Sequence, residues 1–87
     1  MRVFVVDGNR TPFLKARGEP GPFSAVDLAV QAGNALLLRH PEIKPLIQEV
    51  ILGCGSPGAE ATNPARVAAL RMGLGEHMPG WTVQRNC

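Results

Sequence analysis

The stretch "EVILGCGSPGAEATNPARVAAL", from Glu49 to Leu70, decides the fold. It begins with the apolar run Val50-Ile51-Leu52, which is typical of a strand covered on both faces. It ends in a helix whose start is marked by Asn63 at the N-cap. Pro64 occupies the first helical position, where its missing N–H is no loss. A glycine-rich turn joins the two, and the strand-turn-helix order predicts an α/β fold.

The same alternation continues on both sides of that stretch. The residues from Arg2 to Val6 are predicted to form a strand, because they are mostly β-branched or aromatic and nearly all apolar. A helix should begin after Ser24, a good N-cap, and should end before Pro41. The residues from Trp81 to Gln84 complete a β-α-β-α-β order. Crossovers of this length imply parallel strands and right-handed connections.

Two glycines have predicted structural roles. Gly33 falls in the middle of the first helix, where glycine is unfavourable, so we expect a point of close packing there. Gly73 follows the second helix and is expected to adopt the left-handed conformation that ends many helices.

Length and composition limit the possible functions. A chain of 87 residues makes at most one small domain, and 45% hydrophobic residues with 18% charged residues is a globular composition. The net charge of +2 comes from scattered basic residues, so neither a nucleic acid nor a membrane surface is expected as a partner. The apolar run Val3–Val6 is too short for a signal peptide or a membrane span, and the expected location is the cytoplasm.

Cysteine and histidine usage predicts no metal. The two cysteines, Cys54 and Cys87, are too few for a disulfide framework. Together with His40 and His77 they show no paired ligand spacing, so zinc is not expected, and neither is any other cofactor. The two histidines are predicted to lie on the surface or at helix ends.

The turn from Gly53 to Gly58 fits the G-x-G-x-x-G pattern of dinucleotide-binding sites. Such a site needs the helix to begin at the third glycine, so that its N–H groups meet the pyrophosphate. Here the helix signals come only at Asn63-Pro64, and Glu60 would place a negative charge near the phosphates. We therefore favour a long connecting turn and keep a dinucleotide-binding unit as an alternative.

Cys87 directly follows the last predicted strand, where a strand-to-helix turn would come next in an α/β protein. The carboxyl end of a strand is where such folds place ligands, and the dipole of a following helix would favour the thiolate. A thiolate there suits acyl transfer through a thioester. The alternative is an ordinary small buried residue, which the residues alone favour because they identify no base.

Three motifs resemble one enzyme family. "VVDGNRTPF" (5–13), "NPARVAAL" (63–70) and "TVQRNC" (82–87), in this order and spacing, are similar to the N-terminus of thiolases, the acetyl-CoA C-acyltransferases. The resemblance implies that residues 1–87 are an incomplete N-terminal domain of a layered α/β thiolase fold. It also implies that Cys87 accepts the acyl group when 3-ketoacyl-CoA is formed or cleaved, with coenzyme A as substrate.

The resemblance further implies what this sequence lacks. The family's acid/base cysteine and histidine fall outside it, because Cys54, His40 and His77 do not match them. We therefore expect no turnover by this chain alone, and partnership with the remainder of a thiolase in a homodimer or homotetramer. The Arg-Thr-Pro-Phe and Val-Gln-Arg-Asn-Cys motifs resemble degradative members slightly more, so a role in fatty acid β-oxidation is expected, with the biosynthetic direction left open. Asn63 and Arg66 are carried over as interface or structural candidates. A small non-catalytic α/β module that docks onto a partner remains the alternative.

Overall fold

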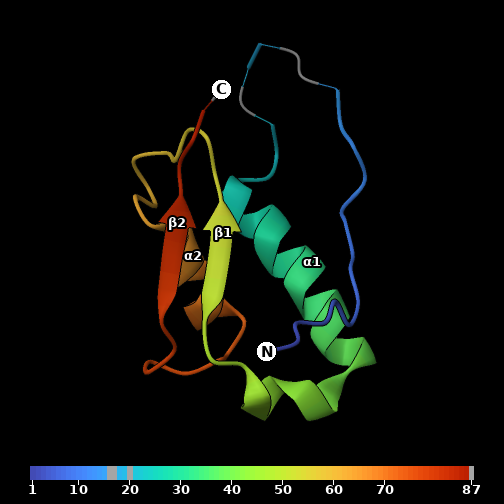
Figure 1. Ribbon diagram of the computed structural model, residues 1–87. Helices are drawn as coiled ribbons and strands as arrows, with labels where there is room; N and C mark the ends of the chain where they lie inside the picture. The colour runs from blue at the N-terminus through green and yellow to red at the C-terminus, as the bar shows by residue number, and fades with distance from the viewer. Residues whose placement is uncertain (16–17, 20, 87) are drawn as a thin grey trace.

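The computed structural model describes residues 1–15, 18–19 and 21–86. Its elements, in chain order, are α1 (Ala25–Arg39), the 3-10 helix η1 (Pro41–Leu46), β1 (Val50–Gly53), α2 (Pro64–Arg71) and β2 (Gly80–Val83). The two strands are parallel, with Val50 opposite Gly80 and Gly53 opposite Val83. Helix α2 packs against the sheet and α1 packs against α2 (Figure 1). The α/β class and the parallel pairing are as predicted.

The start of α1 is capped as its sequence indicates. Ser24 Oγ accepts a hydrogen bond from the Asp27 N–H at 3.1 Å, and Asp27 Oδ2 accepts one from the Ser24 N–H at 2.9 Å. This reciprocal pair is a capping box, which satisfies two backbone donors at the helix start. The helix ends at Arg39, and Pro41 begins η1, so both predicted boundaries are confirmed.

The end of α2 also follows its sequence signal. Gly73 has φ +72°, the left-handed conformation predicted for it. The Gly73 N–H donates to the Leu70 carbonyl at 3.0 Å, and the Leu74 N–H donates to the Ala69 carbonyl at 3.1 Å. These two bonds form a Schellman motif, which satisfies carbonyls that the helix itself leaves without partners.

Small side chains build the contact between the two helices and the sheet. Ala65 and Ala69 of α2 are 0% exposed and Ala68 is 1% exposed. A methyl group built onto Gly33 of α1 would overlap the sulfur of Met72, so Gly33 is a point of close packing, as predicted. The core is therefore thin, and its stability depends on close approach rather than on large buried side chains.

The first predicted strand is wrong. Residues 2–6 form no strand, and the side chains of Phe4 and Val5 are 73% and 95% exposed. An apolar run of this kind is buried only where layers cover both faces of a sheet. The helices cover only one face here, and on the other face Ile51 and Trp81 stay about half exposed at 51% and 49%. The described residues therefore follow the order α-β-α-β.

The N-terminal segment is instead attached to α1. Asp7 Oδ2 lies 2.6 Å from His40 Nε2 and 3.2 Å from Arg39 Nη2. Arg39 Nη2 also donates to the Gly8 carbonyl at 3.0 Å, and Asn9 Nδ2 donates to the Ala32 carbonyl at 3.1 Å. These contacts hold the segment along the helix and away from the edge of β1 (Figure 1).

Candidate functional site

Both strands end at the same edge of the sheet. The glycine-rich turn leaves β1 there, and residues 84–86 leave β2 beside it (Figure 1). Open α/β sheets place their ligands outside the carboxyl ends of the strands, so this edge is the candidate site. Cys87 lies outside the described residues, and its neighbour Asn86 belongs to this edge.

The two segments at the edge contact each other. The Cys54 N–H donates to the Val83 carbonyl at 3.0 Å, which extends the strand pairing beyond Gly53. Gln84 Nε2 donates to the Gly55 carbonyl at 3.3 Å. The glycine-rich turn is therefore fixed to the segment that leads to Cys87.

Asn86 has an unusual backbone conformation. Its φ of +25° makes it the only non-glycine residue with positive φ in the described part of the chain. Asparagine adopts such angles more readily than most residues, because its short polar side chain tolerates the left-handed region. The residue that precedes Cys87 in the sequence therefore has a left-handed φ.

The glycine-rich turn does not have the geometry of a dinucleotide site. Helix α2 begins at Pro64, well after the third glycine of the pattern, Gly58. A methyl group built onto Gly58 would overlap the Glu60 carboxylate, so a negative charge lies where a pyrophosphate would approach. The interpretation as a long connecting turn is confirmed.

Asn63 ties the start of α2 to β2. Its Nδ2 donates to the Gly80 carbonyl at 3.0 Å, and its Oδ1 accepts a hydrogen bond from Thr82 Oγ1 at 2.7 Å. Asn63 occupies the N-cap position as predicted, but its side chain makes no capping bond. Thr82 Oγ1 takes that role, since it accepts from the Ala65 N–H at 3.3 Å.

Arg66 holds the loop that enters β2. Its Nη1 donates to the Met78 carbonyl and its Nη2 to the Glu76 carbonyl, both at 2.8 Å. Asn63 and Arg66 therefore both have structural roles within the chain. A role at a subunit interface stays a prediction for each.

The two histidines lie away from the candidate site. His40 follows the end of α1 and is partly buried beside Asp7, and His77 is exposed in the loop before β2. Both positions are at the amino end of the strands (Figure 1), and both match the prediction of surface or helix-end residues. The hydrogen bond with His40, together with one from the Gly8 N–H, lowers the pKa of Asp7 below its usual value. Neither imidazole is placed to activate a thiol at the opposite edge.

Among the described residues, Cys54 provides a free thiol at the candidate edge. It is partly buried and directly follows β1. Within residues 1–15, 18–19 and 21–86, no three His, Cys, Asp or Glu side chains gather as metal ligands. The described groups at this edge are the Cys54 thiol, backbone amides and the polar side chains of residues 84–86.

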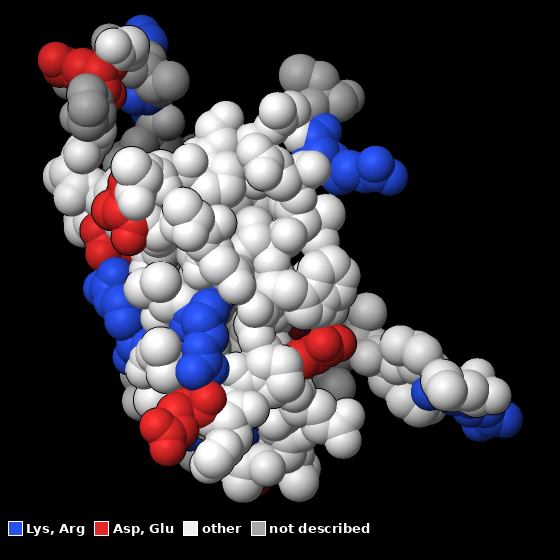
Figure 2. Space-filling view, turned by 90° about the vertical axis from the view of Figure 1, so that its left-hand side faces the viewer, with Lys and Arg blue, Asp and Glu red and all other residues white. Residues whose placement is uncertain are grey.

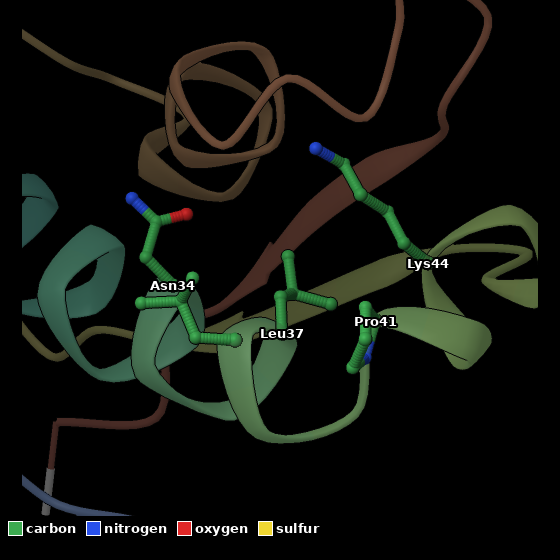
Figure 3. A pocket seen from close by; sticks show the side chains of 5 residues that line it. Asn34, Leu37, Pro41 and Lys44 are labelled. Carbon is green, nitrogen blue, oxygen red and sulfur yellow. The ribbon is translucent and has the colours of Figure 1, made fainter.

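A groove of about 390 Å³ lies elsewhere on the molecule. It is lined by Asn34, Leu37 and Leu38 of α1 and by Pro41 and Lys44 of η1 (Figure 3). The end of α1 and η1 lie at the amino end of the strands, opposite the glycine-rich turn (Figure 1). This groove cannot serve a nucleophile at the carboxyl edge.

Charged side chains of both signs share the face of the molecule that Figure 2 shows. On the face in Figure 2, basic and acidic side chains are interspersed and much of the surface is uncharged. A protein that binds a phosphate backbone needs a continuous basic stripe. None of the helices in the described residues has both the length and the apolar character that a membrane crossing requires.

Comparison with known families settles where the chain belongs. The family described as thiolase, N-terminal domain, matches residues 3–87. The chain belongs to the thiolase family. This match confirms the resemblance found in the three motifs, and it favours neither a docking-only module nor a dinucleotide-binding unit.

Curated thiolases are similar along nearly the whole chain. The chain is 39% identical over 87 residues to the beta-ketoadipyl-CoA thiolase of Pseudomonas aeruginosa. The match covers 98% of this chain and 22% of that protein. It is 38% identical over 86 residues to the 3-oxoadipyl-CoA/3-oxo-5,6-dehydrosuberyl-CoA thiolase of Escherichia coli, covering 97% and 21%. It is 36% identical over 86 residues to the 3-ketoacyl-CoA thiolase of Alteromonas mediterranea, covering 99% and 20%. The chain thus spans about a fifth of the length of these relatives.

Sequence reasoning missed two features of this thiolase segment. It did not find that Thr82 caps α2, nor that Gln84 contacts the turn at Gly55. The only available signal was the parallel order of the strands, which places residues after β1 beside residues after β2. Which side chains meet there is decided by the register, and no local motif encodes it.

Proposed function

We propose that residues 1–87 supply the nucleophile of a thiolase-type acyl-CoA acyltransferase, with Cys87 as the residue that accepts the acyl group. The single observation that supports this is the family match over residues 3–87, which includes Cys87, the fourth residue after the carboxyl end of β2 in the sequence. In this proposal residues 1–87 are part of the N-terminal domain, and coenzyme A takes part as a substrate rather than as a cofactor.

The chemistry proceeds in two transfers. The Cys87 thiolate attacks the thioester carbonyl of an acyl-CoA, an S–C bond forms to the enzyme, and CoA leaves as a thiol after taking a proton. The enolate of acetyl-CoA then attacks the acyl-cysteine, which releases 3-ketoacyl-CoA and restores the thiolate. In the reverse direction CoA cleaves a 3-ketoacyl-CoA through the same acyl-cysteine. A thioester intermediate of this kind divides one difficult step into two easier ones.

The proton transfers need groups that the described residues do not provide. His40 and His77 lie at the amino end of the strands, and His40 is already engaged by Asp7 at 2.6 Å. We therefore propose that the base and the CoA pocket belong to the remainder of a longer thiolase, and that residues 1–87 alone catalyse no turnover.

The printed names of the relatives suggest the substrate class. Those proteins are described as thiolases of beta-ketoadipyl-CoA, 3-oxoadipyl-CoA and 3-ketoacyl-CoA. We propose a 3-ketoacyl-CoA for this chain, a place in β-oxidation, assembly as a homodimer or homotetramer, and a cytoplasmic location. Asn63 and Arg66 would then support the subunit contact by fixing α2 against β2, because their side chains are engaged within the chain.

The test is thiolysis of acetoacetyl-CoA by the full-length polypeptide that carries residues 1–87. Cys87→Ser should lower kcat at least ~1000-fold, as removal of a catalytic nucleophile does in other enzymes. Cys54→Ser is the matched control and should keep wild-type activity. Mass spectrometry after incubation with acetyl-CoA should find an acetyl group on the peptide with Cys87 and not on the peptide with Cys54. Full activity in Cys87→Ser would refute the proposal.

A further inference from the structure

We propose that Gly55 and Gln84 are positioning residues, which hold the segment before Cys87 in the conformation that acyl transfer requires. This inference rests on the proposed function and assigns a role to the glycine-rich turn. The turn carries a conspicuous glycine pattern, yet the late start of α2 and the Glu60 carboxylate make it unsuitable for a dinucleotide.

The first step is the contact between the turn and the nucleophile-bearing segment. Strand pairing continues past the end of β1, because the Cys54 N–H donates to the Val83 carbonyl at 3.0 Å. One residue further, the Gly55 carbonyl accepts a hydrogen bond from Gln84 Nε2 at 3.3 Å. The turn therefore follows the chain for some distance after β2.

The second step is the space at Gly55. A Cβ at this position would lie 3.6 Å from Asn86 Oδ1 and 3.7 Å from Asn86 Cα, which is ordinary contact distance. A methyl group fits there, but the further carbons of a branched side chain would have to displace Asn86. Gly53, two residues earlier, has nothing within 4 Å of its Cβ position, so it offers a matched control.

The third step is the conformation at Asn86. Its φ of +25° lies in a region that L-residues seldom adopt and that asparagine tolerates better than most, and the contacts around it help to maintain it. The described contacts that reach this segment from the turn are those of Gln84 and Gly55. A shift of Asn86 moves the residue that follows it, and a misplacement of about 1 Å costs on the order of 100-fold in rate.

The experiment compares Gly55→Val with Gly53→Val in the full-length polypeptide. We expect Gly55→Val to lower kcat by roughly 10- to 100-fold with little change in the KM for acetoacetyl-CoA, because ligand binding is retained and alignment is lost. Gly55→Ala should restore kcat to within about 3-fold of wild type, since a methyl group fits at contact distance. Gly53→Val should keep the wild-type kcat.

A second readout follows the thiol itself. In a Cys54→Ser background, the rate of alkylation of Cys87 by iodoacetamide should fall in Gly55→Val and stay unchanged in Gly53→Val. Gln84→Glu replaces the donor that faces the Gly55 carbonyl by an acceptor. It should lower kcat and alkylation in the same direction, which keeps the test valid if Gly55→Val does not fold.

The outcomes separate this inference from the function on which it rests. An active wild type whose Gly55→Val and Gln84→Glu variants keep wild-type kcat overturns the positioning role and leaves the proposed function intact. A wild type without thiolysis activity overturns both. An equal loss of kcat in Gly53→Val and Gly55→Val also overturns the positioning role, because it would show a general effect of bulk in this region.

Discussion

Replacing Gly80 by alanine should separate β2 from α2. A Cβ at Gly80 would lie 3.0 Å from the Ala65 carbonyl carbon, the Ala65 oxygen and the Arg66 Cα. All three are backbone atoms, so no side-chain rotation can relieve the contact. Ordinary contact begins at 3.4 Å, so strand and helix must move apart by about 3.4 − 3.0 = 0.4 Å. The alanines of α2 are among the most deeply buried side chains of the described residues, so the separation opens the core that they form.

The free energy of unfolding should fall by an amount that a matched variant isolates. Overpacking a well-packed site costs about 1–3 kcal/mol. Any Gly→Ala change also restricts the unfolded chain, which stabilises by roughly 0.4–1 kcal/mol where the backbone allows it. Gly53→Ala, at the end of β1, carries the second effect without the first, because nothing lies within 4 Å of its Cβ position. The difference between the two variants should therefore be about 1–3 kcal/mol, with Gly80→Ala the less stable.

Trp81 provides the assay. It is the single tryptophan of the sequence and directly follows Gly80 in β2, so its fluorescence reports whether β2 is docked. Urea unfolding of the 87-residue chain carrying either variant should give different midpoints. By thermal unfolding, each 1 kcal/mol should appear as about 4–8 °C for a domain of this size. Equal midpoints would refute the argument that helix and strand approach as closely as the structure shows.

Two further changes test the contacts around α2. Thr82→Val removes the hydroxyl that accepts a hydrogen bond from the N–H of the buried Ala65. The free energy of unfolding should fall by about 1–3 kcal/mol, because a buried donor is left unsatisfied. Thr82→Ser keeps a hydroxyl and should recover most of that loss in the same urea titration. The pKa of Asp27 is lowered from its usual 3.8 by the Ser24 N–H first and by Arg71 second, so its carboxylate contributes stability above the unfolded pKa. That contribution should be lost as the pH falls through the folded pKa, and Asp27→Asn should flatten this part of a plot of melting temperature against pH; an unchanged slope would contradict it.

Helix boundaries were predictable because their causes are local. Ser24 needs only Asp27, three positions away, to form its capping box. Pro64 fits the first helical position by its own ring geometry. Gly73 fits the left-handed position because it lacks a Cβ. In each case the interacting groups are close in sequence, so the pattern contains all the information that the structure uses.

The N-terminal strand could not be judged in this way. The residues from Arg2 to Val6 have the composition of a strand covered on both faces, but composition states a preference and does not supply a partner. The preference goes unmet in the described residues because the sheet has helices on one face only. The polar contacts of Asp7 and Asn9 with α1 then determine where the segment lies.

The candidate site shows the same division between local and distant causes. That a residue after β2 would reach the carboxyl edge followed from strand order alone. The hydrogen bond between Gln84 and Gly55 joins residues 29 positions apart, and the one between Thr82 and Asn63 joins residues 19 positions apart. Both depend on register. The glycine pattern is misleading because glycines at a fixed spacing indicate only where the backbone can bend. The groups that pack against the turn distinguish a phosphate-binding loop from a structural connection. Here those groups are Glu60 beside Gly58 and Asn86 beside Gly55.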